Sequence, residues 1–140
     1  MKKLNTIMLT FAMLLFTTTG VMAQSEQDQS VIKADEKAKV QVYYFHGDRR
    51  CETCKAVGKV SQDLVDSQYG DNKNVEFIEV NYDEKGNEAL VEKFEVTSSG
   101  LYVYNQEKVT NLTTYAFQYA KTDPAKLESK IKNLIDKNLK

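Results

Sequence analysis

The chain contains two cysteines, Cys51 and Cys54, and only Glu52 and Thr53 lie between them. A disulfide between them would close a very short loop, and the shorter the loop, the less a disulfide stabilises a protein. The same spacing suits a dithiol that cycles between reduced and oxidised states. We therefore expect the pair to do redox chemistry, and an inert structural disulfide is the alternative.

The predicted position of the pair favours redox chemistry. Cys51 follows a predicted strand and opens a predicted helix, and a helix N-terminus favours a thiolate through its partial positive charge and unpaired N–H groups. Arg49 and Arg50 add positive charge beside Cys51, whereas Glu52 opposes them. In this geometry Cys51 lies at the exposed helix tip and Cys54 lies one turn deeper. We assign Cys51 as the attacking nucleophile and Cys54 as the resolving thiol.

A thiophilic ion is the alternative partner of these cysteines. Zinc usually takes four nitrogen or sulfur ligands, and the chain offers two cysteines and one histidine, His46. Soft ions such as Cu(I) or trivalent arsenic prefer thiolates and need fewer ligands. A site built from Cys51, Cys54 and His46 therefore stays open. His46 could instead act as a proton carrier, or simply hydrogen-bond locally at the end of its strand.

We expect no cofactor besides a redox-active Cys51–Cys54 disulfide. The sequence has no Gly-rich phosphate loop, no Ser-His-Asp spacing and no flavin or nicotinamide fingerprint. It carries 19 Lys and Arg against 20 Asp and Glu, a net charge of −1. Because a nucleic-acid-binding domain would show a basic face, a nucleic-acid partner is not expected.

Residue periodicity predicts the elements that must position the cysteines. Strands are expected over about 40–45, 75–82, 101–104 and 109–112. Helices are expected from Cys51 to Gly70, over about 87–94, and from Pro124 onward. The last helix has Asp123 as its N-cap and Pro124 at its first position, which is a favoured arrangement. Its apolar stripe consists of Leu127, Ile131, Leu134 and Ile135.

The predicted order, β-α-β-α-β-β-α, belongs to the α/β class. The first β-α-β unit should be parallel with a right-handed crossover, and the later strand pair should be a hairpin that closes a mixed sheet with helices on both faces. This order, with a Cys-x-x-Cys opening the first helix, is that of the thioredoxin-like fold. Several aromatic residues are expected to pack in the sheet and loops, or else to line a groove beside the cysteines: Tyr102, Tyr104, Tyr115, Phe117 and Tyr119.

The N-terminal segment has the pattern of a secretory signal peptide. Lys2 and Lys3 precede an apolar run over 7–16, and Ala23 offers a small residue at the cleavage position. The apolar run is about half the ~20 residues that a spanning helix needs. We expect a signal peptide over 1–23, a flexible tether over 24–37 and one domain over 38–140. That domain would be periplasmic or otherwise exported.

The segment 42–55, which reads VYYFHGDRRCETCK, resembles a known family. Exported bacterial thioredoxin-like proteins share a Tyr-Phe-His-Gly-x-x-Arg-Cys-x-x-Cys signature. They are named the nitrophenyl compound nitroreductase subunit ArsF family and are linked to arsenic-resistance gene neighbourhoods. The segment 111–113 (NLT) and the later Phe117 are also similar to this family, and the resemblance covers about residues 38–139.

The resemblance implies roles for residues and partners. Cys51 and Cys54 would be the redox pair, and His46, Arg49 and Arg50 would be flanking signature positions that tune the pKa or contact the substrate. The partner would be a protein thiol or disulfide, including a membrane electron-transfer protein. We expect the domain to act as a monomer.

The chain departs from the wider thioredoxin pattern in two places. Thioredoxins have a cis-proline just before the third core strand, whereas the segment 96–101 has no proline and the only one is Pro124. They also have a buried acid six residues before the first cysteine, and Phe45 stands there. These departures predict slower or more specialised disulfide exchange.

Overall fold

The computed structural model describes residues 38–140, so the predicted signal peptide (1–23) and tether (24–37) lie outside the described residues. The elements are, in chain order, β1 (Val40–His46), α1 (Glu52–Tyr69), β2 (Val75–Asn81), α2 (Glu88–Lys93), β3 (Gly100–Tyr104), β4 (Val109–Asn111), α3 (Thr113–Tyr119) and α4 (Pro124–Leu139). None of the helices in this part of the chain is long and apolar enough to cross a membrane.

The four strands form one mixed sheet in the order β2-β1-β3-β4. β1 runs parallel to β2, with Val40 opposite Val75, and antiparallel to β3, with Phe45 opposite Gly100. β3 and β4 form the predicted antiparallel hairpin. The chain therefore has the predicted thioredoxin-like α/β fold.

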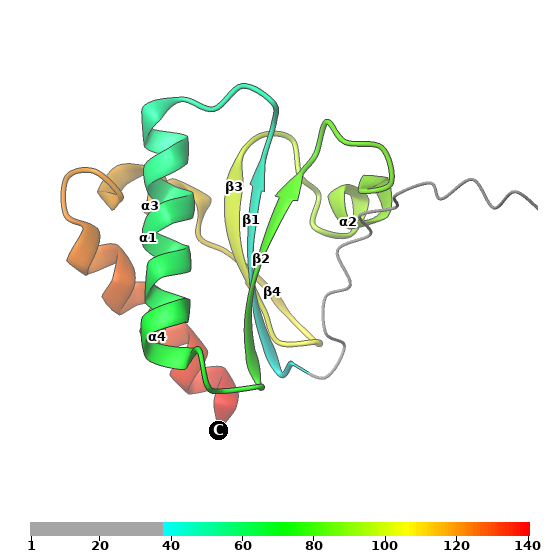
Figure 1. The fold of residues 1–140 in the computed structure, drawn as a ribbon. Coiled ribbons are helices and arrows are strands. Elements are labelled where there is room, and N and C mark those ends of the chain that lie inside the picture. Colours follow the sequence, from blue (N-terminus) through cyan, green and yellow to red (C-terminus); the bar gives the residue numbers. More distant parts are fainter. Residues whose placement is uncertain (1–37) are drawn as a thin grey trace, which may run out of the picture.

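Helices cover both faces of this sheet (Figure 1), as predicted. α1, α3 and α4 pack on one face, where Leu127, Ile131 and Ile135 of α4 are fully buried. α2 lies over the other face, and Phe94 at its C-terminal end packs among the aromatic rings there. The centre of the sheet, β1, is buried along its whole length and is thereby fixed from both sides.

Alternation along β1 sends neighbouring side chains to opposite faces. Tyr44 belongs to the apolar cluster beneath α1, whereas Phe45 belongs to the cluster on the α2 face. Phe45 stands six residues before Cys51, where the wider thioredoxin pattern has its buried acid, but it points away from α1. The residue that faces α1 from this part of the strand is Tyr44.

The structure adds one helix to the predicted order. α3 holds Tyr115, Phe117 and Tyr119, which the sequence analysis placed in sheet and loop packing. The prediction failed because this helix is short, is rich in aromatic and β-branched residues of low helix propensity, and has no side-chain hydrogen bond at its N-cap, Leu112. It is held instead by burial of Leu112, Ala116 and Ala120, which are spaced four residues apart.

The last helix begins as predicted. The Asp123 carboxylate accepts a hydrogen bond from the Lys126 backbone N–H at 3.2 Å, and Pro124 is the first helical residue. Leu134 of the predicted stripe is only half-buried, while the other three members form the buried face.

Candidate active site

Both cysteines lie at the N-terminus of α1, which follows the loop after β1. Cys51 is the N-cap residue with an extended backbone (φ −75°, ψ 163°), and its Sγ accepts a hydrogen bond from the Cys54 backbone N–H at 3.1 Å. An N-cap side chain normally satisfies one of the unpaired N–H groups of the first turn. Here a sulfur atom takes the place of the usual oxygen, which is an arrangement that favours a thiolate.

The two thiols have opposite environments. Cys51 is exposed, and the pKa of its thiol is held below the ordinary value by hydrogen bonds from the Cys54 side chain first and then from the Cys54 backbone N–H. Cys54 is buried, and burial raises the pKa of its thiol. The accessible sulfur is thus the better nucleophile near neutral pH, since the thiolate is the reacting species.

The two arginines that precede Cys51 differ in their contacts. The Arg50 guanidinium forms an ion pair with Glu79 at 2.6 Å. Arg49 is exposed and makes no ion pair with any residue in 38–140. The pKa of Cys51 is therefore lowered by the hydrogen bonds of the first helical turn rather than chiefly by these cations.

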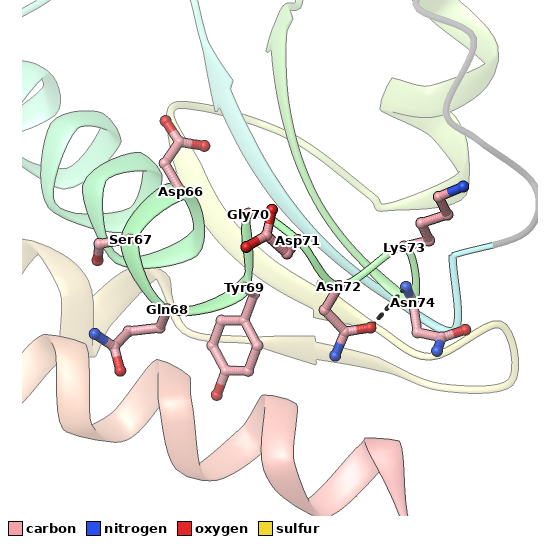
Figure 2. A pocket seen from close by; sticks show the side chains of 9 residues that line it. All are labelled: Asp66, Ser67, Gln68, Tyr69, Gly70, Asp71, Asn72, Lys73 and Asn74. Atoms are coloured by element: carbon pink, nitrogen blue, oxygen red, sulfur yellow. Dashed lines mark hydrogen bonds between the residues drawn. The ribbon is translucent and has the colours of Figure 1, made fainter.

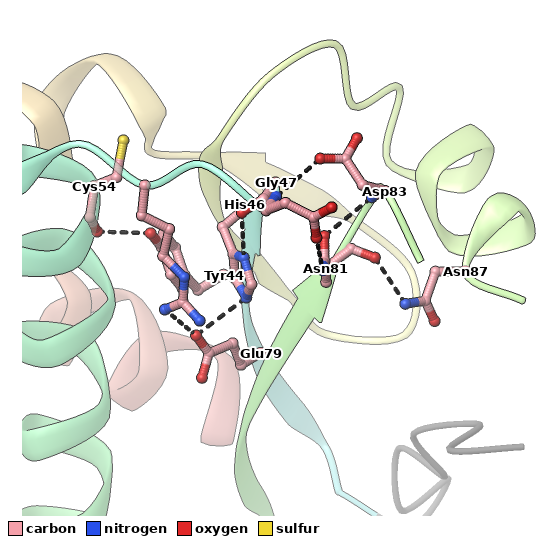
Figure 3. A network of polar contacts seen from close by, with 10 residues as sticks. Tyr44, His46, Gly47, Cys54, Glu79, Asn81, Asp83 and Asn87 are labelled. Atoms are coloured by element: carbon pink, nitrogen blue, oxygen red, sulfur yellow. Dashed lines mark hydrogen bonds and ion pairs between the residues drawn. The ribbon is translucent and has the colours of Figure 1, made fainter. Parts of the chain in front are cut away.

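His46 is buried at the end of β1 and shares its carboxylate partner with Arg50. Its Nε2 lies 3.2 Å from Glu79 Oε1, the same oxygen that Arg50 contacts, and its Nδ1 lies 3.0 Å from the Gly47 carbonyl oxygen. Figure 3 shows this set of contacts beside the start of α1. The imidazole is thus fixed against the edge of the sheet, with an acceptor at each ring nitrogen.

The alternative three-ligand metal site is not assembled. Across residues 38–140, no group of three or more His, Cys, Asp or Glu side chains is placed to hold a metal ion. His46 faces Glu79 and Gly47 and does not join Cys51 and Cys54 in such a group.

The loop that leads into Cys51 is hydrogen-bonded to residues at the C-terminal end of β2 and just after it. The Asp48 backbone N–H donates to the Asp83 carboxylate at 2.8 Å, and the Asn81 side-chain amide donates to the Asp48 carboxylate at 2.8 Å. A Cβ on Gly47 would lie 2.7 Å from an Asp83 carboxylate oxygen, so a larger residue here would require the Asp83 side chain to shift. The contacts, drawn in Figure 3, fix the path of the chain between β1 and the helix tip.

Three residues that contact this site were not predicted from the sequence. The Tyr44 hydroxyl donates to the Cys54 carbonyl oxygen at 2.6 Å, and Glu79 joins Arg50 to His46. Ser99, half-buried just before β3, forms a side-chain hydrogen bond that acts to lower the pKa of Cys54. Ser99 lies in the segment that lacks the proline, and the described chain has no cis peptide bond. The only sequence signal for Tyr44 was its position in β1, because alternate residues of a strand point to the same face of the sheet.

The aromatic residues pack against the apolar clusters on the two faces of the sheet. Tyr115 and Tyr119 stack on each other at 4.6 Å, and the ammonium group of Lys126 lies 4.0 Å from the Tyr119 ring centre. Tyr102 packs edge-on against Phe45 on the opposite face of the sheet from α1. These rings serve packing, which was the first of the two readings.

A shallow pocket of about 580 Å³ lies at the other end of α1, where residues 66–74 turn into β2. Figure 2 shows polar side chains and backbone around it, including Asp66, Asp71 and Asn74. α1 has 18 residues and is about 27 Å long at 1.5 Å per residue, so the pocket and Cys51 lie at opposite ends of this helix. It is therefore separate from the dithiol.

No protein-family model matches the chain, and no curated protein matches it significantly. Five solved chains do match. One, described as the structure of a malarial protein, is 20% identical, with 57% of this chain and 93% of that chain covered and a TM-score of 0.41. Another, the crystal structure of Trxlp from Edwardsiella tarda EIB202, is 19% identical, with 66% and 81% covered and a TM-score of 0.45. The thioredoxin-like fold of this chain follows from its own strand order and strand directions.

Proposed function

We propose that the protein is a thiol–disulfide oxidoreductase in which Cys51 attacks and Cys54 resolves. One observation carries the proposal. The exposed Cys51 Sγ caps α1 by accepting the Cys54 N–H at 3.1 Å, while Cys54 is buried directly behind it. This arrangement gives one accessible, stabilised thiolate and one protected thiol, which is the asymmetry that two-step disulfide exchange requires.

The exchange proceeds in two balanced steps. The Cys51 thiolate attacks one sulfur of a partner disulfide, so a Cys51–partner bond forms, the partner S–S bond breaks, and the second partner sulfur leaves as a thiolate. Cys54 then gives up its proton to the departing thiolate or to solvent and attacks Cys51 Sγ. The Cys51–Cys54 disulfide forms, the Cys51–partner bond breaks, and the remaining partner sulfur leaves as a thiolate that takes up a proton. Two electrons have then passed to the partner, which ends as a dithiol. The reverse sequence oxidises a partner dithiol.

The proposal extends to the family, the location and the partner of the protein. The signature over 42–55 supports membership of the ArsF family of exported thioredoxin-like proteins. With the predicted signal peptide over 1–23, it supports work in the periplasm or an equivalent exported space. The partner that we propose is a protein thiol or disulfide, including that of a membrane electron-transfer protein. We propose that the domain acts on it as a monomer.

Trapping the first intermediate tests the assignment of the two cysteines. The reduced protein is mixed with glutathione disulfide as the probe, and the products are read by intact mass. Cys54→Ser should accumulate a mixed disulfide with one glutathione on Cys51, because no resolving thiol remains. The wild type should release two molecules of glutathione and lose the mass of two hydrogen atoms as its internal disulfide forms.

Cys51→Ser is the matched control, because it keeps the buried thiol and removes the exposed one. It should react with glutathione disulfide far more slowly than Cys54→Ser. The assignment is contradicted if Cys51→Ser forms the adduct as fast as Cys54→Ser. A wild type that retains a stable glutathione adduct would also contradict it, since Cys54 would then not resolve.

A further inference from the structure

Tyr44 places a hydroxyl in the interior of the protein directly against the active-site turn. Its side chain is 0% exposed, and the hydroxyl donates to the Cys54 carbonyl oxygen at 2.6 Å, as Figure 3 shows. Burial raises the pKa of Tyr44 well above its ordinary value. The hydroxyl therefore keeps its proton and remains a donor across the whole range in which thiols titrate.

The Tyr44 ring is closely packed against α1 at Gly58. A Cβ on Gly58 would lie 2.6 Å from Tyr44 Cε1 and 2.9 Å from Cδ1, so the ring already fills the space that a side chain at Gly58 would occupy. β1, which carries the tyrosine, is the buried second strand of the sheet. The hydroxyl is thus a fixed point that joins the sheet to the first turn of α1.

Cys54 is held at both of its peptide groups. Its N–H points at Cys51 Sγ at 3.1 Å, and its carbonyl oxygen is held by Tyr44. Because peptide groups are planar and each residue has only two soft torsions, fixing the carbonyl restricts where the N–H of the same residue can point. The first turn of a helix otherwise tends to fray, and fraying would turn this donor away from the sulfur.

We propose that Tyr44 is a positioning residue for the dithiol, whose hydroxyl fixes the first turn of α1 so that the Cys54 N–H stays aimed at Cys51 Sγ. The inference rests on the proposed function and adds the residue that keeps the nucleophile activated. Tyr44 does not touch the reacting sulfur of Cys51. It acts through the backbone of Cys54.

The same helix offers a matched comparison. Tyr69 is also buried, and its hydroxyl donates at 2.6 Å to Asp136, but it lies in the last turn of α1. Tyr44→Phe and Tyr69→Phe each remove one oxygen atom and one short hydrogen bond. If Tyr44 served only to stabilise the fold, the two substitutions would have the same effect on the reactivity of Cys51.

The test is the pH dependence of Cys51 alkylation by iodoacetamide, followed by mass spectrometry of the reduced protein. Wild-type Cys51 should titrate below the ordinary cysteine value. At a pH below that midpoint, Tyr44→Phe should slow alkylation by about two- to fivefold, part of the net effect of one hydrogen bond. Tyr69→Phe should leave the rate at the wild-type value.

The outcomes separate the inference from the function on which it rests. A lowered wild-type midpoint that Tyr44→Phe leaves unchanged, or that both variants shift equally, would overturn the role of Tyr44 and leave the function standing. A wild-type Cys51 that titrates at the ordinary value would overturn both, because there would be no stabilised thiolate to position.

Hydrogen exchange of the wild type gives a second test that needs no variant to fold. If Tyr44 fixes the first turn, the backbone amides of 54–58 should exchange as slowly as those at the centre of α1. Rapid exchange confined to this first turn would overturn the inference, since a frayed turn cannot keep the Cys54 N–H on the sulfur.

Discussion

At Cys51, the geometry of a helix N-cap decides the chemistry. The sulfur accepts a backbone N–H and lies in the positive end of the α1 dipole, so its negative charge is stabilised without a fully charged partner in contact. Cys54, one turn away, is buried, and burial raises the pKa of its thiol. Two identical side chains therefore acquire different roles from the same helix turn.

Glu79 offsets the positive charge of Arg50, the residue that precedes Cys51 in the sequence. It pairs with Arg50 at 2.6 Å and with His46 at 3.2 Å through one carboxylate oxygen. We predict that Glu79→Gln lowers the pKa of Cys51 by a few tenths of a pH unit, because an anion is removed and Arg50 is left uncompensated. Alkylation of Cys51 at pH 6 should then become faster. Stability should change by only about 0–1 kcal/mol, since the pair is partly exposed.

Asp63→Asn provides the control for this charge change. Asp63 pairs with Lys59 on the exposed side of α1, far from Cys51 along the helix. Because screening limits exposed charges to about 8 Å in physiological salt, this variant should leave the Cys51 titration unchanged. An equal effect of the two variants, or a slower alkylation in Glu79→Gln, would show that Glu79 does not act locally on the thiolate.

Some residues of the site could be predicted from the sequence, and others could not, for a simple physical reason. Cys51, Cys54 and their placement at a helix start were predictable, because a motif and a change of periodicity are local signals. Tyr44 and Glu79 were not, because their contacts depend on the register that sets Tyr44 opposite Glu79 in the parallel β1–β2 pair. Arg50 was identified from the sequence, but its ion pair with Glu79 could not be, because Glu79 lies on a different strand.

α1 carries a glycine in its interior for a packing reason. Ala at an exposed helix position is favoured over Gly by about 1 kcal/mol. At Gly58 a Cβ would come within 2.6 Å of the buried Tyr44 ring. We predict that Gly58→Ala destabilises the protein by about 1–3 kcal/mol, the usual result of overpacking a core, when unfolding in urea is measured.

Gln62→Ala is the comparison for helix propensity alone, since Gln62 is exposed on the same helix. It should change stability by less than about 0.5 kcal/mol. A Gly58→Ala protein as stable as the wild type would mean that the Tyr44 ring can move. The fixed link between β1 and the active-site turn would then be wrong.

At the scale of elements, the sequence predicted those with strong local signals. α4 was recognised by Asp123, Pro124 and its apolar stripe, and the four strands lie within one or two residues of their predicted bounds. α3 was missed because tertiary burial of Leu112, Ala116 and Ala120, rather than propensity or capping, holds it. The spacing of these three small or apolar residues was the available signal.

At the scale of the whole domain, the dithiol lies at the N-terminal end of α1, in the layer of helices that packs on one face of the sheet. In the loop before Cys51, Asp48 forms hydrogen bonds with Asn81 at the end of β2 and with Asp83 just after it. α1 packs against the sheet beside α3 and α4. The sulfur atoms therefore sit on a preorganised frame, so the relative stability of dithiol and disulfide is a property of the folded domain. A stabilised Cys51 thiolate favours the reduced form and makes the disulfide more oxidising.

The reduction potential of the Cys51–Cys54 pair tests this account most directly. The folded protein is equilibrated in glutathione or dithiothreitol redox buffers, and the two forms are counted by mass after thiol labelling. A working pair with a stabilised thiolate should lie between about −270 and −120 mV, the range of disulfide oxidoreductases. A potential below about −300 mV, where structural disulfides lie, would contradict the redox function and leave the pair as an inert bridge.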